Sequence, residues 1–327
     1  MGILFTIPMG FLFTITMGIL FTITIGIQLT IYKALIVSGL VVSFLDAQDV
    51  KYISKKSYQK GLEKFLSWLS ANNIVQPDRS DILKFKSWLI ESGLTANTVN
   101  SYLVAVKRFF AYLEGIKKYP NVAKDIKGVK QPKGHLRESL TISQIKELLS
   151  QFDTSTLRGK RDFAIVNLMA RTGLRTIEVV RANIEDLKQE GGEALLFIQG
   201  KGRDSKDSFV VLTEKSLKPI LAYLKARGTT DPKEPLFSSL SDRNKGQKLT
   251  TRTIRQIVKE YLRKININSK KLSAHSLRHS FATLSLRADA PLLQVKEALR
   301  HASIETTQKY LHNIDRIENG AERYIDF

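Results

Sequence analysis

The chain has 327 residues, enough for two domains. Its 51 Lys and Arg residues against 31 Asp and Glu residues give a net charge of +20 at pH 7, which favours nucleic acid as a partner over a membrane surface. The absence of cysteine excludes disulfides, thiolate zinc sites and cysteine nucleophiles, and it fits a reducing cytoplasm.

Residues 1–45 carry a single charge, Lys33, and begin with an eight-residue repeat that reads MGILFTIP, MGFLFTIT and MGILFTIT before it decays. So long an apolar stretch meets the length criterion for a membrane span. It lacks the basic start and the cleavage site of a secretory signal. We interpret it as a translated tandem DNA repeat rather than a membrane anchor, and we do not expect it to belong to the fold.

Residues 46–127 place apolar side chains at helical spacing. Helices are expected over 54–70, 79–92 and 95–113, with a short fourth helix at 122–126. Together they predict a small helical bundle. Lys107 and Arg108 on the third helix are candidates for phosphate contacts, although such a basic pair is at least as often a solvated helix face.

Residues 128–138 combine Gly, Pro and Lys in no regular order, which is typical of a basic linker between domains. The remainder, 139–327, predicts a second domain. Helices are expected over 142–152, 158–172, 214–226 and 252–264, and strand-like runs at 194–199 and 208–212 form a hairpin. The helix at 158–172 is the most apolar and should lie at the centre of the domain. The expected fold is mainly α with a small β-hairpin or sheet, an α+β arrangement.

Arg175 ends the motif R-T-G-L-R and stands where a new helix begins. Backbone N–H groups and the helix dipole favour an anion there, and an ion pair with Glu178 one turn on is compatible with that role. Lys201 lies at the tip of the hairpin in G-K-G, with Lys206 as a second candidate in the same hairpin.

The stretch 274–311 holds the remaining candidates. His275 and Arg278 are three positions apart, so they share one face of a helix. His301 follows a Pro-containing turn and a short amphipathic run, and Tyr310 lies nine residues after it at the start of a further helix. Alone, each of these residues is more simply a surface or packing residue; their order and spacing make the pattern specific.

These side-chain types suit phosphoryl transfer. A tyrosine has a pKa of about 10, so it needs cations or a base to act as a nucleophile. Guanidinium groups match the charge on a pentacoordinate phosphorus, and imidazoles move protons near neutrality. The sequence has no Walker A motif, no H-E-x-x-H and no G-x-S-x-G.

The succession R-T-G-L-R, G-K-G, H-x-L-R-H, L-x-H and a later tyrosine resembles the tyrosine site-specific recombinases, the phage integrase and Xer-type family. The resemblance covers residues 141–311 firmly and 46–134 more loosely, and it implies a helical core-binding domain that clamps DNA beside a catalytic domain. The catalytic residues that it implies are Arg175, Lys201, His275, Arg278, His301 and Tyr310.

In this reading Arg175 and Arg278 bind the phosphate, Lys201 protonates the leaving 5′-oxygen, and Tyr310 becomes a 3′-phosphotyrosine. No metal, cofactor or small-molecule substrate is implied. The implied partner is double-stranded DNA with a specific recombination site, bound by a homotetramer on two sites that is a monomer or weak dimer in free solution. Such an enzyme works in the cytoplasm, at the nucleoid, as the integrase or excisionase of a mobile element or as a Xer-type resolvase.

Two alternatives stay open: an inactive DNA-binding protein of the same fold, and a type IB topoisomerase-like enzyme. One residue departs from the family pattern, since Arg300 stands where a glycine usually precedes the second-block histidine. A left-handed backbone at a residue other than glycine costs about 1–2 kcal/mol. Either the turn differs, or Arg300 supplies an added phosphate contact.

Overall fold

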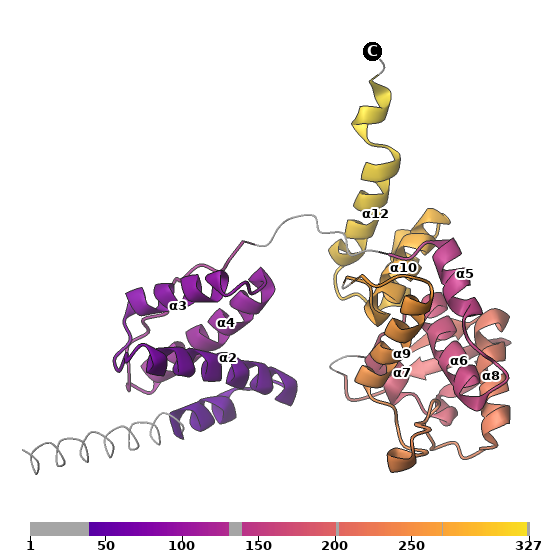
Figure 1. Cartoon of the computed structure of the whole chain (residues 1–327), viewed down its shortest axis with the longest axis horizontal. Helices are drawn as coiled ribbons and strands as arrows, with labels where there is room; N and C mark the ends of the chain where they lie inside the picture. Colours follow the sequence, from indigo (N-terminus) through magenta and orange to yellow (C-terminus); the bar gives the residue numbers. More distant parts are fainter. Residues whose placement is uncertain (1–38, 131–138, 201–202, 270, 326–327) are drawn as a thin grey trace, which may run out of the picture. The chain divides into compact units, whose positions relative to one another are not determined.

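The computed structural model describes residues 39–130, 139–200, 203–269 and 271–325, and the chain forms two compact units that divide between Lys133 and Gly134 (Figure 1). The eight-residue repeat lies outside the described residues, and of the apolar stretch 1–45 the structure describes residues 39–45. Within the described residues, no helix combines the length and apolar character that a membrane crossing requires.

The first unit is a helical bundle, as predicted. It consists of a helix at residues 39–47, α2 (Tyr52–Ala71), α3 (Arg79–Glu91) and α4 (Ala96–Gly115). Asp78 caps α3 and Thr95 caps α4 with side-chain oxygens that accept backbone N–H groups of the first turn. Residues 122–125 form a turn and not the expected fourth helix, because so short a segment cannot repay helix nucleation.

The expected boundary at residue 46 falls inside the helix at residues 39–47. Phe44 is fully buried in the aromatic core of this unit, with its ring 5.5 Å from that of Phe109 and 5.7 Å from that of Tyr112. A side chain packed so tightly belongs to the bundle. The fold therefore begins before residue 46, and the last turns of the presumed leader are part of it.

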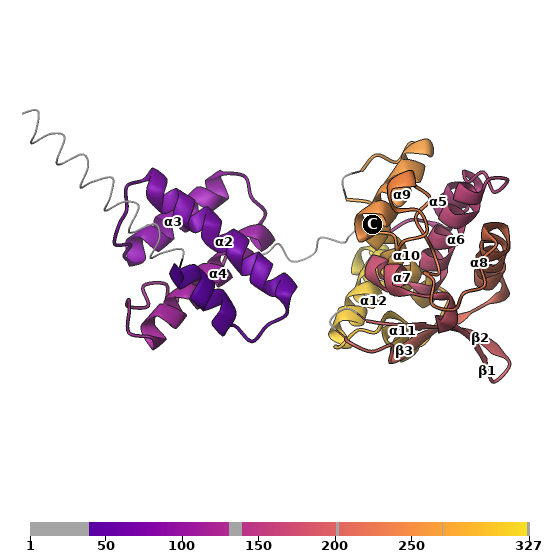
Figure 2. The ribbon, with the colours of Figure 1, turned by 90° about the horizontal axis from the view of Figure 1, so that it is seen from below.

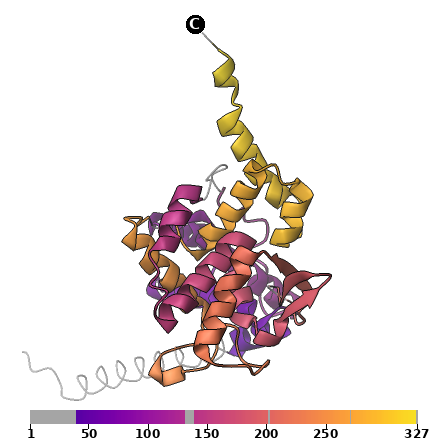
Figure 3. The ribbon, with the colours of Figure 1, turned by 90° about the vertical axis from the view of Figure 1, so that its right-hand side faces the viewer.

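The second unit is built around α6, and Figures 2 and 3 show the other helices and the sheet gathered about it. Its helices are α5 (Ile142–Ser150), α6 (Leu157–Thr172), α7 (Thr176–Arg181), α8 (Glu214–Arg227), α9 (Thr251–Lys264), α10 (Ala274–Arg287), α11 (Leu292–Leu299) and α12 (Glu305–Glu318). Most of α6 is buried, which confirms its predicted central place. The far end of α12 and the turn that follows project from the unit (Figures 1 and 3).

The sheet has three antiparallel strands in the order β1 (Leu187–Glu190), β2 (Glu193–Ile198) and β3 (Ser208–Leu212). The hairpin of β2 and β3 was predicted; in the structure Leu195 lies opposite Val211. The first strand was not predicted. It joins β2 through Gly191 and Gly192, which both adopt the positive φ that a tight two-residue hairpin turn requires.

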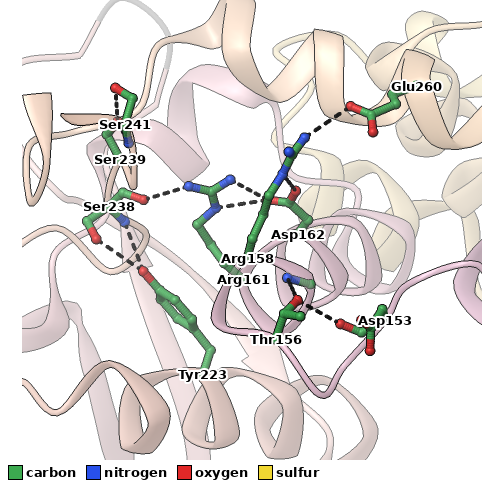
Figure 4. A network of polar contacts seen from close by, with 11 residues as sticks. Asp153, Thr156, Arg158, Arg161, Asp162, Tyr223, Ser238, Ser239, Ser241 and Glu260 are labelled. Atoms are coloured by element: carbon green, nitrogen blue, oxygen red, sulfur yellow. Dashed lines mark hydrogen bonds and ion pairs between the residues drawn. The ribbon is translucent and has the colours of Figure 1, made fainter. Parts of the chain in front are cut away.

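A polar network ties α6 to the segment at residues 238–241 and to α9 (Figure 4). Arg161 donates to the buried carboxylate of Asp162, at 2.7 Å, and to the carbonyl oxygen of Ser238, at 3.1 Å. Arg158 pairs with Glu260 at 3.3 Å. Burial raises the pKa of Asp162, and the nearby arginines oppose that shift. These contacts fix α6, whose last turn leads directly into the candidate site.

Candidate active site

Arg278 lies at the centre of the site and is only 2% exposed. It is carried by α10, which begins at Ser273, where the serine hydroxyl accepts the N–H of His275. The guanidinium donates to the carbonyl oxygen of Gly173 at 2.7 Å and to that of Leu299. Arg278 thus joins the end of α6, the end of α11 and its own helix.

The charge of Arg278 is not neutralised by a carboxylate, since it takes part in none of the ion pairs found in the described part of the chain. Burial and, after it, the charge of the neighbouring Arg175 lower the pKa of its guanidinium to about 9, while the charge of Glu178 acts in the opposite direction. The group still carries its proton at neutral pH. Its hydrogen bonds within the described residues go to backbone carbonyl oxygens, and a buried cation held by such dipoles is a favourable place for an anion.

Arg175 and Arg300 share one buried acid, Glu178. The carboxylate is fully buried; it accepts the Arg175 guanidinium at 2.8 Å and the Arg175 backbone N–H at 2.7 Å. Arg300 donates to its second oxygen at 2.8 Å. Arg300 itself has φ 54° and ψ 46°, so the backbone at this turn is left-handed although the residue is not glycine. Arg175 keeps its predicted place at a helix start, where it precedes Thr176.

His301 follows this turn and is half-buried. Its Nδ1 lies 2.9 Å from the hydroxyl of Thr307, which is fully buried on α12. Burial and, after it, the charges of Arg278 and Arg175 lower the pKa of His301 to about 4. The imidazole is therefore neutral near pH 7, and Thr307 fixes its orientation.

Tyr310 lies on the second turn of α12, half-buried, with its ring parallel to that of His301 at a centroid distance of 6.4 Å. Its hydroxyl is hydrogen-bonded to Nδ1 of His279 on α10. The ring of His279 lies 4.7 Å from that of His275, edge to face. The phenol is thus enclosed by imidazoles from two elements of the same unit.

His279 was not predicted as a site residue, although it closes the motif H-x-L-R-H. Its position four residues after His275 on the same helix was the available signal. The remaining sequence candidates lie elsewhere. Lys201 falls outside the described residues, and Lys206 is held by both carboxylate oxygens of Asp186 at 2.7 Å. Lys107 and Arg108 lie in the first unit, where the guanidinium of Arg108 lies over the ring of Tyr58.

Comparison with known proteins identifies the family to which the chain belongs. The profile of the phage integrase family matches residues 138–316, and that of the N-terminal SAM-like domain of phage integrases matches residues 49–115. The chain belongs to the phage integrase family. Relatives of this integrase-family chain include tyrosine recombinase XerD of Listeria monocytogenes, 32% identical over 79% of the chain and 86% of the relative. Tyrosine recombinase XerA of Pyrococcus furiosus is 33% identical over 82% of the chain and 86% of the relative.

Solved structures agree. The integrase-family chain matches the XerH site-specific recombinase in its post-cleavage complex with palindromic difH substrate at a TM-score of 0.69, with 26% identity, over 83% of the chain and 80% of that structure. The Tn1549 transposon integrase, at 17% identity and a TM-score of 0.66 over 83% and 93%, shows the same fold. The predicted fold class and the predicted family are confirmed, and the chain is a tyrosine recombinase.

Proposed function

We propose that the protein is a site-specific recombinase that cuts and rejoins double-stranded DNA through a 3′-phosphotyrosine on Tyr310. The observation that carries this proposal is the hydrogen bond between the Tyr310 hydroxyl and His279, with the ring of His301 parallel to that of Tyr310, in the same unit as the buried, positively charged Arg278. A phenol among imidazoles with an anion-binding arginine in the same unit is the arrangement that transfer to a phosphorus atom needs.

The reaction follows from these contacts. The scissile phosphate binds Arg278 and Arg175, whose guanidinium groups stabilise the charge on its non-bridging oxygens. The Tyr310 oxygen attacks phosphorus and gives its proton to an imidazole, for which His279 is the partner already in contact. The bond from phosphorus to the 5′-oxygen breaks. Lys201 is proposed, from the family resemblance, to protonate that oxygen.

His301 serves as a neutral hydrogen-bond donor. With its pKa near 4 it is uncharged at neutral pH, and its Nδ1 is engaged by Thr307. Its Nε2 is then the nitrogen that can donate to a phosphate oxygen. The free 5′-hydroxyl of a partner strand reverses the first step, so bond energy is conserved and the chemistry consumes no nucleotide cofactor.

The domain assignment forms part of this proposal. The helical unit clamps the DNA, with Lys107 and Arg108 on phosphates, residues 128–138 link the units, and 139–327 carry the chemistry. The active assembly is a homotetramer on two specific sites, built from monomers or weak dimers, and it works in the cytoplasm at the nucleoid. XerH and the Tn1549 integrase were solved with DNA, which supports a DNA partner for this relative.

A nicked suicide substrate tests the function, because cleavage releases a short strand and traps the covalent protein–DNA adduct. We expect an adduct with the unmodified chain and none with Tyr310→Phe. Tyr324→Phe is the matched control, since that side chain is 80% exposed in the same unit. Joint molecules between two duplexes distinguish recombination from relaxation by a topoisomerase-like enzyme. Tight DNA binding with no adduct under any condition would favour the inactive binding protein.

A further inference from the structure

Arg300 is the charged residue of the site to which the proposed reaction gives no role. Its side chain is only 13% exposed, and its backbone is in the left-handed region. One guanidinium nitrogen donates to the carbonyl oxygen of Ala298 within the same turn. A second donates to Glu178, which lies 122 positions earlier in the chain, in α7.

Glu178 is held from two sides. One carboxylate oxygen accepts the Arg175 guanidinium, and the other accepts both the Arg175 backbone N–H and Arg300, at distances of 2.7–2.8 Å. Because the acid is fully buried, its carboxylate cannot turn to water when a partner is lost. Arg300 therefore fixes the plane of the carboxylate, and the carboxylate fixes the guanidinium of Arg175.

The charge balance around Glu178 also gives Arg300 a role. Paired with Arg175 alone, Glu178 would cancel most of the positive charge that a phosphate should meet. With Arg300 as a second partner, the group of one acid and two arginines keeps a net positive charge. Burial lowers the pKa of the Arg300 guanidinium, and its ion pair with Glu178 opposes that shift.

We propose that Arg300 is a positioning residue, which acts through Glu178 to hold Arg175 in the geometry that binds the scissile phosphate. The role rests on the proposed function. It also explains why an arginine occupies a left-handed turn: its guanidinium ties the end of α11, directly before His301, to the start of α7.

A double-mutant cycle tests the proposal, with Arg300→Gln, Glu178→Gln and the double variant read as single-turnover cleavage rates on the suicide substrate. Misplacement of a catalytic group costs up to about 10²-fold. We expect Arg300→Gln to slow cleavage by about 10- to 10²-fold, but by less than about twofold when Glu178 is already Gln. Arg300→Lys, which still offers the carboxylate a cation, should recover part of the rate.

Arg227→Gln is the matched control. Arg227 is 9% exposed and, like Arg300, donates to a glutamate (Glu234) and to a nearby backbone carbonyl. It should lower the melting temperature and leave the cleavage rate unchanged. DNA affinity, measured by anisotropy in the Tyr310→Phe background, should change by less than about threefold in Arg300→Gln, because Arg300 contacts the acid and not the DNA.

Three outcomes would overturn the role. Rate losses that multiply in the double variant would show that Arg300 does not act through Glu178. A loss confined to DNA affinity would make Arg300 a phosphate contact. An unmodified chain that forms no adduct would remove the proposed function together with this role; the same cycle read in melting temperature would then still report the ion pair as a purely structural contact.

Discussion

The left-handed turn at Arg300 can be tested by stability alone, with the variants Arg300→Gly and Arg300→Ala. Both remove the guanidinium and leave Glu178 with Arg175 as its remaining partner in the described site. Losing a hydrogen bond to a buried charged group costs about 1.5–3 kcal/mol, so both variants should be less stable than the unmodified chain. At φ 54°, alanine retains the left-handed strain of about 1–2 kcal/mol, which glycine does not bear.

The unmodified chain should therefore be the most stable, followed by Arg300→Gly and then Arg300→Ala. The glycine variant should be more stable than the alanine variant by about 1 kcal/mol, because the greater chain entropy that glycine loses on folding offsets part of the strain that it relieves. For a unit of this size, that corresponds to about 2–4 °C in melting temperature. Both tryptophans, Trp68 and Trp88, lie in the helical unit, so tryptophan fluorescence follows that unit only. Far-UV circular dichroism follows both. The variants should lower the melting transition of the second unit, which is seen by circular dichroism, and leave the fluorescence transition of the helical unit unchanged.

An alanine variant as stable as the glycine variant would refute the left-handed conformation. An alanine variant at least as stable as the unmodified chain would show that the ion pair with Glu178 contributes nothing to stability. A shift in the fluorescence transition would place the effect in the wrong unit.

Three further predictions concern other parts of the chain. Phe44→Ala should cost about 3–5 kcal/mol and lower the fluorescence transition, whereas an unchanged transition would put that ring outside the bundle. Gly173→Ala should abolish adduct formation: the added Cβ would lie 2.6 Å from Phe281 at φ 63° and displace the carbonyl that Arg278 binds, and a fully active variant would contradict this packing. The pKa of His301 is lowered to about 4 from 6.5, so between those values the unfolded chain binds more protons and stability is lost as pH falls from 6.5 towards 4. An NMR titration of His301 with a midpoint at or above 6.5 would show that the ring is not held neutral.

Local sequence patterns were enough for most of the helices, because most have an apolar face of their own and several have a side-chain cap. Thr141 caps α5 and Thr156 caps α6, as their spacing to the first helical turn suggests. The strand β1 escaped prediction because LKQE is short and largely polar. It is a strand only because its backbone pairs with β2, with Lys188 opposite Leu195.

The start of the fold was misplaced for a compositional reason. The first charged residue after Lys33 is Asp46, so the change in composition suggested a boundary there. A helix at the end of an apolar stretch is hard to recognise from the sequence, because too few polar residues are present to distinguish its exposed face from its buried face. Phe44 is recognisable as a core residue only from the rings that enclose it.

Within the site, the motifs identified candidate residues, and the ion pair of Arg175 with Glu178 could be anticipated because the two lie one helical turn apart. The long-range partners could not be anticipated. His279 meets Tyr310 across 31 positions, and Arg300 meets Glu178 across 122, so neither contact has a local signature. Both depend on how α10, α11 and α12 pack against the end of α6. Sequence spacing predicts which side chains share a helix face; tertiary packing decides which of them share a ligand.

That packing also explains how the site keeps its charge before DNA arrives. Arg278 is bound by the carbonyl oxygens of Gly173 and Leu299, which orient it and carry no charge. Burial without an acid destabilises its charged form, as its lowered pKa of about 9 records, but does not discharge it at neutral pH. In the proposed reaction, a phosphate would supply the missing counter-charge, so that binding would recover free energy that folding spent on desolvating the guanidinium. The one acid of this group, Glu178, is paired with Arg175 and Arg300 and not with Arg278, which would therefore remain available to a phosphate in the proposed reaction.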